Sequence, residues 1–599
     1  RVGIAQALCG SPDALILDEP TAGLDPAQTA AVMHDEGPAL VLAGPGSGKT
    51  TVITNRAVRL AANKCEPSRL LCVTFTNAAA EEMRQRYLKL AETMVPDFAP
   101  DASDIPVFYT VHAFCNNIIS EYEKRTGVRY VRIEGEDSPR NSIFERIYKK
   151  YNGSVPDEAM LERIKGYLRR EKEGTGRSGE EIQKAPSGKN QIRRFSDIVR
   201  EYTRVKKENG YIDFDDMVLM SLELLTVNEE IRGWARGLFD YIQVDEAQDL
   251  SRAQYEVLRM IAGNANIFIV ADDDQSIYGF RGAEPQCLFD FAAEYPDAAR
   301  YELTRNFRST PEIVKASAAL VSVNKKRFFK DLYTTADNSP GSFCTVFPHD
   351  AKSQAMLCAQ EALASITAGE SLAVLYRNGV SSLPVRAALT ANGIKYATSG
   401  NCPRAWEQLT VRDGFNELLK AERKSRLIVP DPSATFRRIL RGGFAELMEE
   451  QCRLEGHDRK TVSVSMDFLG LVTDNSVSYD AAVRFLDAVE RADNLSRTSG
   501  DNLLPSVMLS TIHSAKGLEY DRVIVIDVLE GEMPGSEAAG DAVEEERRLL
   551  YVAMTRARRK LIISCPLRRG MRGEEESRFV RELDPAGDGS VSPEIELAH

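Results

Sequence analysis

The chain alternates between short apolar runs and longer segments in which apolar and polar residues are mixed. The apolar runs contain four to six residues, which is typical of strands buried on both faces. They are residues 39–42, 70–75, 241–244, 267–270, 372–376 and 507–510. Segments with helical periodicity follow several of these runs, for example residues 52–60 and 78–90. The pattern predicts an α/β protein with polar residues at the strand ends.

A glycine-rich segment follows the first apolar run and precedes a predicted helix. It reads Ala-Gly-Pro-Gly-Ser-Gly-Lys-Thr over residues 43–50. Glycines let backbone N–H groups surround phosphate oxygens, and the N-terminus of the helix adds the positive end of its dipole. Lys49 would reach the β- and γ-phosphates, and the Thr50 hydroxyl would hold Mg²⁺. The predicted phosphate loop consists of Gly44, Pro45, Gly46, Ser47, Gly48, Lys49 and Thr50.

Two acidic residues follow the apolar run 241–244 directly. A carboxylate at a strand end beside a phosphate loop is a ligand that suits Mg²⁺, and Asp245 fits that role. The neighbouring Glu246 can polarise the attacking water. Gln275, which follows the apolar run 267–270, can contact the γ-phosphate. Together with the phosphate loop, these residues predict an ATPase or a GTPase.

A second set of side chains at strand ends suits single-stranded nucleic acid. It combines hydroxyl, amide, imidazole, aromatic and basic groups, which can hold a phosphate backbone and stack on bases. Its members are Phe75, Asn77, Thr110, His112, Tyr278, Phe280 and Arg281. For Phe75, and for Phe114 nearby, packing in the core is an equally good interpretation when each residue is taken alone.

Composition narrows the class of protein. A chain of 599 residues is too long for one core, so we expect three or four domains or subdomains. A net charge of −13 argues against uniform coating of nucleic acid but leaves room for a local basic groove. The ten cysteines lack metal-ligand spacing, so we expect reduced thiols in a cytoplasmic protein. No apolar run is long enough to span a membrane, and we expect no membrane partner.

Residues 1–26 have a pattern of their own. Residues 14–20 read as an apolar strand that ends in Asp18 and Glu19, and residues 21–26 follow as Thr-Ala-Gly-Leu-Asp-Pro. This segment resembles the magnesium-binding strand and following loop of ABC transporter ATPases. Those enzymes carry a phosphate loop upstream, which this sequence does not show. We expect a remnant without a catalytic role.

Eight motifs then occur in a fixed order: AGPGSGKT, TFTNAAAEEM, TVHAFC, VDEAQD, DDDQSIYGFRGA, LTRNFRS, TIHSAKGLEY and YVAMTRAR. From Leu24 onward the chain resembles the UvrD/Rep/PcrA family of superfamily-one DNA helicases. The resemblance implies two RecA-like P-loop lobes, built from parallel sheets flanked by helices, each with a mainly helical insert. It also implies ATP between the lobes and single-stranded DNA across their tops.

The resemblance assigns further roles residue by residue. Arg308 and Arg556 of the second lobe would act as arginine fingers on the transferring phosphoryl group. We expect residues 544–558 to form a helix with Arg556 near its end, preceded by a solvated acidic loop that begins at residue 530. His513 would contact DNA, and Glu519 would contact the ATP ribose.

The adenine site departs from the family pattern. Phe307 stands where the family has a tyrosine that stacks on adenine, and Thr51 stands where close relatives have an arginine on the other adenine face. Selectivity for ATP would therefore rest more on Gln28, whose amide can both accept from and donate to an adenine edge.

The expected domains are the remnant (1–26), the first lobe in two parts (27–118 and 213–284) with its insert (119–212), the second lobe in two parts (285–378 and 505–583) with a short insert (379–504), and a tail (584–599).

The predicted function is that of an ATP- and Mg²⁺-dependent 3′–5′ DNA helicase or translocase. Its expected partners are single-stranded DNA, junctions of single and double strands, and repair or replication proteins. The segment 438–444 only partly resembles the family's glycine hairpin for duplex contact, so a translocase that unwinds poorly stays an alternative. An ABC transport ATPase and a nonenzymatic DNA-binding scaffold are two further alternative functions. Intact catalytic residues argue against the scaffold.

Overall fold

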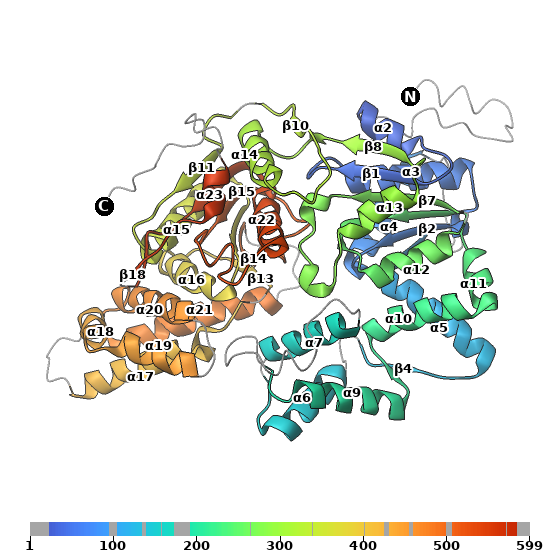
Figure 1. The fold of residues 1–599 in the computed structure, drawn as a ribbon. Helices are drawn as coiled ribbons and strands as arrows, with labels where there is room; N and C mark the ends of the chain where they lie inside the picture. Colours follow the sequence, from blue (N-terminus) through green and yellow to red (C-terminus); the bar gives the residue numbers. More distant parts are fainter. Residues whose placement is uncertain are drawn as a thin grey trace. The chain divides into compact units, whose positions relative to one another are not determined.

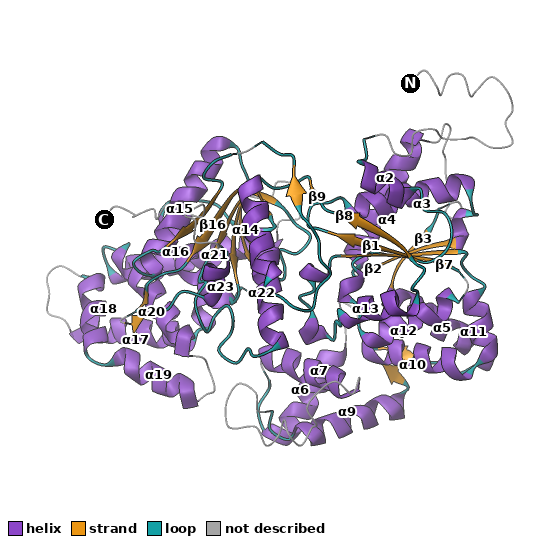
Figure 2. Cartoon of the chain, turned by 45° about the horizontal axis from the view of Figure 1, so that its top comes forward, coloured by secondary structure: helices purple, strands orange, loops and turns teal. Residues whose placement is uncertain are grey.

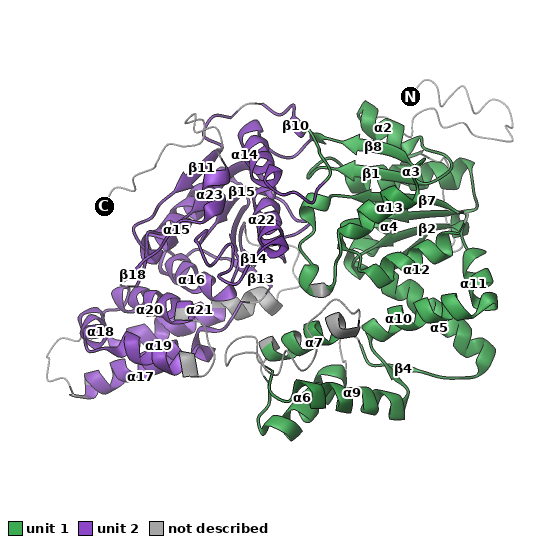
Figure 3. Cartoon of the chain, in the orientation of Figure 1, with its two compact units in different colours: residues 1–186, 190–305, 328–331 green, residues 187–189, 306–327, 332–599 purple. Residues whose placement is uncertain are grey.

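The computed structural model divides the chain into two compact units (Figure 3). It describes residues 23–94, 105–134, 139–156, 158–172, 192–263, 265–337, 339–400, 402–424, 431–454, 459–498, 506–570 and 572–583. The first unit holds the described residues up to 305 together with 328–331, and the second holds 306–327 and the described residues from 332 onward. The ABC-like segment lies outside the described residues except for 23–26, where Asp25 caps helix α2 (Pro26–Val32).

A six-stranded parallel sheet forms the centre of the first unit, with the strand order β3-β2-β6-β7-β1-β8. The strands are β1 (Ala39–Ala43), β2 (Leu70–Thr74), β3 (Val107–Thr110), β6 (Tyr241–Val244), β7 (Asn266–Ala271) and β8 (Ala299–Leu303). All strands run the same way, so their carboxyl ends lie along one edge. The residues that follow β1, β6 and β7 are therefore neighbours there, although they are far apart in sequence.

Helices cover both faces of this sheet (Figures 1 and 2). Successive side chains of a strand point to opposite faces, and two separate hydrophobic clusters follow that alternation. One cluster packs α3 (Lys49–Asn63) and α4 (Asn77–Met94) against alternate strand residues. The other packs the remaining residues against α5 (Val111–Thr126), α10 (Phe214–Val227), α11 (Glu229–Arg236), α12 (Arg252–Ala262) and α13 (Gln286–Glu294).

The first insert has a hydrophobic core of its own, which runs from Ile133 to Val205. Its helices are α6 (Pro139–Asn152), α7 (Glu158–Lys172) and α9 (Phe195–Asn209). The chain enters and leaves it through the paired short strands β4 (Val131–Arg132) and β5 (Tyr211–Ile212). The insert begins later than residue 119, because α5 up to Thr126 packs on the first sheet.

A second six-stranded parallel sheet forms the centre of the second unit, with the strand order β11-β16-β15-β12-β14-β13. The strands are β11 (Phe343–Val346), β12 (Leu372–Tyr376), β13 (Ala397–Ser399), β14 (Val507–Thr511), β15 (Tyr520–Val525) and β16 (Ala557–Ser564). The accompanying helices are α14 (Pro311–Ser322), α15 (Ala351–Ala368), α16 (Ser382–Ala391), α22 (Asp541–Met554) and α23 (Arg578–Glu582). The short strands of this unit are β10 (Tyr333–Thr334), β17 (Arg568–Arg569) and β18 (Arg572–Gly573), and the short strand β9 (Arg305–Asn306) has one residue in each unit.

The second insert shares one hydrophobic core with the sheet of its own unit. Its helices are α17 (Leu409–Lys424), α18 (Pro432–Arg441), α19 (Phe444–Leu454), α20 (Arg459–Asp474) and α21 (Tyr479–Thr498). The predicted start at residue 379 is too early, because β13 pairs with β14 in the sheet. Gly442 and Gly443 join α18 to α19, so the segment 438–444 consists of the end of α18, a two-residue turn and the first residue of α19.

Two further expectations are corrected by the structure. The predicted division between the lobes at residues 284 and 285 is too early, because β8 pairs with β1 and the first unit continues to residue 305. Arg556 lies beyond the end of α22 at Met554, in the turn that leads into β16. None of the helices in the described residues is long and apolar enough to cross a membrane.

Candidate active site and nucleic-acid surface

The predicted phosphate loop joins β1 to α3. Gly46 and Gly48 have φ values of 64° and 83°, in the left-handed region that glycine adopts without strain. The Ser47 hydroxyl donates to the carbonyl of Gly44 over 2.7 Å, within the loop. Lys49 is the first residue of α3, and Thr50 follows it in the first helical turn. Backbone N–H groups at the start of α3 are therefore available for phosphate oxygens.

Gln28 supports this loop from α2. Its amide Nε2 donates to the carbonyl of Ser47 over 2.8 Å, and its side chain is buried. Gly48 passes so close that an added Cβ would lie 2.6 Å from Gln28 Nε2. Gln28 thus lies against the phosphate loop, its Oε1 accepts from the backbone N–H of Asp25 over 3.1 Å, and its contact with adenine stays a prediction. Thr51, the other predicted adenine neighbour in this unit, lies in the first turn of α3.

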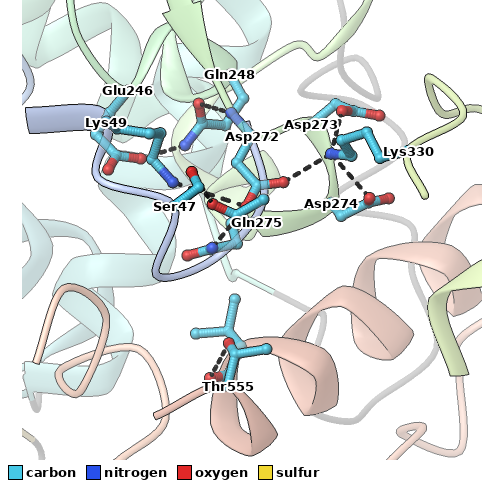
Figure 4. A network of polar contacts seen from close by, with 12 residues as sticks. Ser47, Lys49, Glu246, Gln248, Asp272, Asp273, Asp274, Gln275, Lys330 and Thr555 are labelled. Carbon is cyan, nitrogen blue, oxygen red and sulfur yellow. Dashed lines mark hydrogen bonds and ion pairs between the residues drawn. The ribbon is translucent and has the colours of Figure 1, made fainter. Parts of the chain in front are cut away.

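The strand end after β7 meets the phosphate loop through Asp272 (Figure 4). Lys49 Nζ lies 3.7 Å from Asp272 Oδ2, and Gln275 Nε2 donates to the same oxygen over 2.6 Å. Gln248 accepts from the backbone N–H of Asp272 over 3.0 Å and donates to Glu246. The ends of β6 and β7 are thereby linked. Asp272 and Gln248 lie within the motifs of the sequence, but no role was predicted for either of them.

Asp245 and Glu246 follow β6 at the same edge of the sheet. Burial and the neighbouring charge of Glu246 raise the pKa of the Asp245 carboxyl to about 7, against the opposing effect of Lys49. Glu246 has a φ of 51°, an uncommon conformation for a residue other than glycine, which often marks functional sites. Carboxylate and hydroxyl oxygens suit Mg²⁺, so the chemistry of Asp245 and Thr50 fits the predicted metal site.

The predicted finger residues lie in the second unit, at the loop after β9 and the turn before β16. Arg308 donates through Nε to Glu519 over 2.6 Å and through Nη1 to the carbonyl of Thr555 over 3.0 Å. Glu519 also pairs with Arg558. The side chain of Arg556 is buried, and its Nε donates to the carbonyl of Val552 over 2.9 Å. Arg308 and Glu519 are therefore brought together as an ion pair.

Phe307 and His513 belong to the same unit. Phe307, the predicted adenine neighbour, precedes Arg308 and is 50% exposed, as a residue that stacks on a ligand needs to be. His513 follows β14 and lies in a turn that begins at Thr511.

A cavity of about 720 Å³ in the first unit brings together most of the predicted DNA-binding residues. The predicted residues that line it are Phe75, Asn77, Thr110, His112 and Phe280. Phe75 also stacks on Tyr278, with ring centres 5.3 Å apart and ring planes 13° apart. Phe75 is therefore not a core residue, whereas Phe114 is buried in the core. The Arg281 side chain lies outside the part of the chain that the structure describes.

The first insert contributes basic and acidic side chains to the wall of this cavity, which sequence reasoning did not identify. Lys165 of α7, Arg132 and Arg140 line it together with Glu134 and Asp215. Arg140 pairs with Glu134 and lies 3.3 Å from Asp215, so the charges in this wall are largely compensated. The aromatic rings of the cavity suit stacking on a base, whereas the compensated charges add little attraction for phosphate.

Comparisons with known proteins identify the family of this chain. The sequence model of the UvrD/REP helicase N-terminal domain matches residues 24–296, and that of the UvrD-like helicase C-terminal domain matches residues 467–567. The chain is 29% identical to the putative ATP-dependent DNA helicase YjcD of Bacillus subtilis, over 94% of this chain and 81% of that protein. It is 28% identical to the ATP-dependent DNA helicase PcrA of Bacillus subtilis, over 94% of this chain and 86% of that protein. It is also 28% identical to PcrA of Leuconostoc citreum, over 94% of this chain and 85% of that protein. The chain belongs to the UvrD/Rep family of DNA helicases.

Proposed function

We propose that this chain is a motor that hydrolyses ATP to move along single-stranded DNA in the 3′–5′ direction and to separate duplex DNA. Its cellular work would be repair, replication or recombination of DNA in the bacterial cytoplasm, together with repair or replication proteins. The observation that carries the proposal is the edge of the first sheet, where Lys49, Asp245 and Gln275 follow the adjacent strands β1, β6 and β7.

These residues divide the work of phosphoryl transfer. Lys49 and the N–H groups of the phosphate loop would hold the phosphates, and Thr50 with Asp245 would hold Mg²⁺, which neutralises developing charge. Glu246 would polarise the attacking water, and Gln275 would contact the γ-phosphate. Arg308 and Arg556 would supply further positive charge to the transferring group. For Arg308 this requires release from Glu519, because the two side chains are paired.

The cavity lined by Phe75 and Phe280, together with the neighbouring ring of Tyr278, provides the proposed contact with single-stranded DNA. Stacking on Phe75, Tyr278 or Phe280 tolerates any base, because every base has a π face. A motor that moves along DNA needs such tolerance. His513 in the second unit would add a further contact to the strand.

The direction and the products of movement test the proposal. A duplex with a 3′ single-stranded tail and a matched duplex with a 5′ tail are incubated with the protein, ATP and Mg²⁺, and the displaced strand is measured. We expect displacement from the 3′-tailed substrate alone, and none with Lys49→Ala. Displacement from the 5′-tailed substrate alone would contradict the proposed polarity.

A translocase that unwinds poorly is the second candidate. The observation in its favour is the segment 438–444, which spans the end of α18, a two-residue turn and the start of α19 and only partly resembles the family's hairpin. Removal of streptavidin from a biotinylated single strand without displacement from the 3′-tailed duplex would favour this candidate.

A further inference from the structure

Lys330 lies at the centre of three buried aspartates. Its ammonium nitrogen is 2.8 Å from Asp272 Oδ1, 2.7 Å from Asp273 Oδ1 and 2.9 Å from Asp274 Oδ2. The side chains of all four residues are fully buried. Carboxylates buried side by side repel one another and are costly to ionise without a cation. One oxygen of each carboxylate lies within 4.8 Å of one oxygen of each of the others, and the Lys330 ammonium group contacts all three side chains.

The chain holds Lys330 in place through its neighbours. Residues 328–331 belong to the first unit, although the chain on both sides of them belongs to the second. The backbone N–H of Phe328 donates to Asp273 Oδ2 over 2.8 Å. The Phe328 ring stacks on Phe289 of α13, with ring centres 4.4 Å apart and planes 10° apart. Lys330 thus approaches the aspartates from an anchored segment.

Asp272 connects this cluster to the nucleotide site, because its two oxygens have different partners (Figure 4). Oδ1 accepts from Lys330, whereas Oδ2 accepts from Gln275 over 2.6 Å and faces Lys49 at 3.7 Å. The Lys330 contact therefore fixes the rotation of the carboxylate. That rotation decides which oxygen is presented to Gln275.

We propose that Lys330 is a positioning residue for ATP hydrolysis, which holds Asp272 so that its second oxygen orients the Gln275 amide toward the γ-phosphate. The inference rests on the proposed function of Gln275. When the ammonium group is removed, Asp272 rotates, and Gln275 loses its fixed acceptor. The chemical step slows, whereas ATP binding depends on the phosphate loop and is retained once the charge is balanced.

Two variants separate positioning from charge balance. Lys330→Met leaves three buried carboxylates without their cation, which places excess negative charge near the phosphates and lowers stability. The double variant Lys330→Met/Asp274→Asn removes one negative charge together with the positive one, so the net charge of the cluster is unchanged. Lys325→Met, a change of an exposed lysine shortly before this segment, is the matched control.

The experiment measures kcat for ATP hydrolysis, the Kd of a fluorescent ATP analogue and the thermal midpoint in the full chain. We expect kcat to fall at least tenfold in the double variant, while Kd changes less than threefold and the thermal midpoint lies between those of the single variant and the wild type. The single variant should show weaker analogue binding as well. The control variant should match wild type in all three measurements.

A double-mutant cycle with Gln275→Ala shows whether Lys330 acts through Gln275. We expect Gln275→Ala to lower kcat in the wild-type background and to have little further effect in the double variant, because coupled residues are not additive. A double variant with wild-type kcat, or one that does not fold, would overturn the proposal and make Lys330 a purely structural residue. A wild-type chain without ATP hydrolysis would instead refute the proposed function.

Discussion

The close approach of Gly48 to Gln28 predicts how the phosphate loop responds to an added methyl group. Gly48→Ala places a Cβ at a φ of 83°, which costs about 1–2 kcal/mol for an L-residue. The same Cβ would lie 2.6 Å from Gln28 Nε2, so the amide must move away from the Ser47 carbonyl. The lost hydrogen bond adds about 1 kcal/mol. We expect Gly48→Ala to destabilise the first unit by about 2–3 kcal/mol.

Gly37→Ala is a matched control for the backbone cost. Gly37 has a φ of 87°, and an added Cβ there meets nothing within 4 Å. Its substitution should therefore cost only the conformational part, about 1–2 kcal/mol. Gln28→Ala should cost about 1 kcal/mol less in Gly48→Ala than in the wild-type chain, because the hydrogen bond to Ser47 is already broken there, whereas the bond that Gln28 Oε1 accepts from the Asp25 N–H is lost in both backgrounds.

Tryptophan fluorescence can follow the first unit alone. The chain has two tryptophans, Trp234 on α11 of the first unit and Trp406 in the second. In a Trp406→Phe background, urea unfolding monitored through Trp234 gives the free energy of unfolding of the first unit for each variant, measured without nucleotide. Equal losses for Gly48→Ala and Gly37→Ala, with an additive effect of Gln28→Ala, would refute the predicted contact.

Three further predictions concern DNA binding, charge pairing and pH. Phe75→Ala should weaken the binding of single-stranded DNA by about 1–3 kcal/mol, because a stacking ring is lost, and should leave ATP binding unchanged. Fluorescence anisotropy measures the DNA affinity, and Phe329→Ala, a change of an exposed ring that does not line the cavity, is the control. Arg140→Met should destabilise the first insert by about 3–5 kcal/mol, because buried acidic side chains lose their cation; unchanged resistance to limited proteolysis would contradict this. Burial raises the pKa of Asp467 to about 7, so its protonated form stabilises the fold below that pH, and stability falls as pH rises from about 4 to 7. Asp467→Asn should therefore raise the melting temperature at pH 8 and flatten the pH dependence of stability in calorimetry. The same pH dependence in the variant and the wild type would contradict the assignment.

The local parts of the nucleotide site could be predicted from the sequence, because each lies within one strand-turn segment. Lys49 and Thr50 follow β1, and Asp245 and Glu246 follow β6, as the apolar runs and polar ends indicate. The adjacency of β6, β7 and β1 could not be derived from the runs themselves, because strand order depends on packing between distant segments. The family resemblance supplied that part of the fold.

Long-range charge pairs account for most of what sequence reasoning missed. Lys330 lies 58 residues from Asp272, and no periodicity connects the two. Glu532 falls in a segment predicted to be a solvated acidic loop, yet it is buried and lies near Lys460 and Arg569. A charged residue is predicted to be exposed from the sequence unless its partner is known. The early lobe boundary has a similar cause, since β8 joins the first sheet only through its pairing with β1.

ATP hydrolysis with and without single-stranded DNA tests the central claim most directly. The wild-type chain and Lys49→Ala are compared at saturating ATP and Mg²⁺, with and without an unstructured oligonucleotide. For a motor that is driven by ATP and activated by DNA, we expect the oligonucleotide to stimulate ATP hydrolysis by the wild type strongly, and we expect almost no turnover in the variant. Wild-type turnover that does not respond to DNA, or a Lys49→Ala variant that hydrolyses ATP at the wild-type rate, would contradict the account.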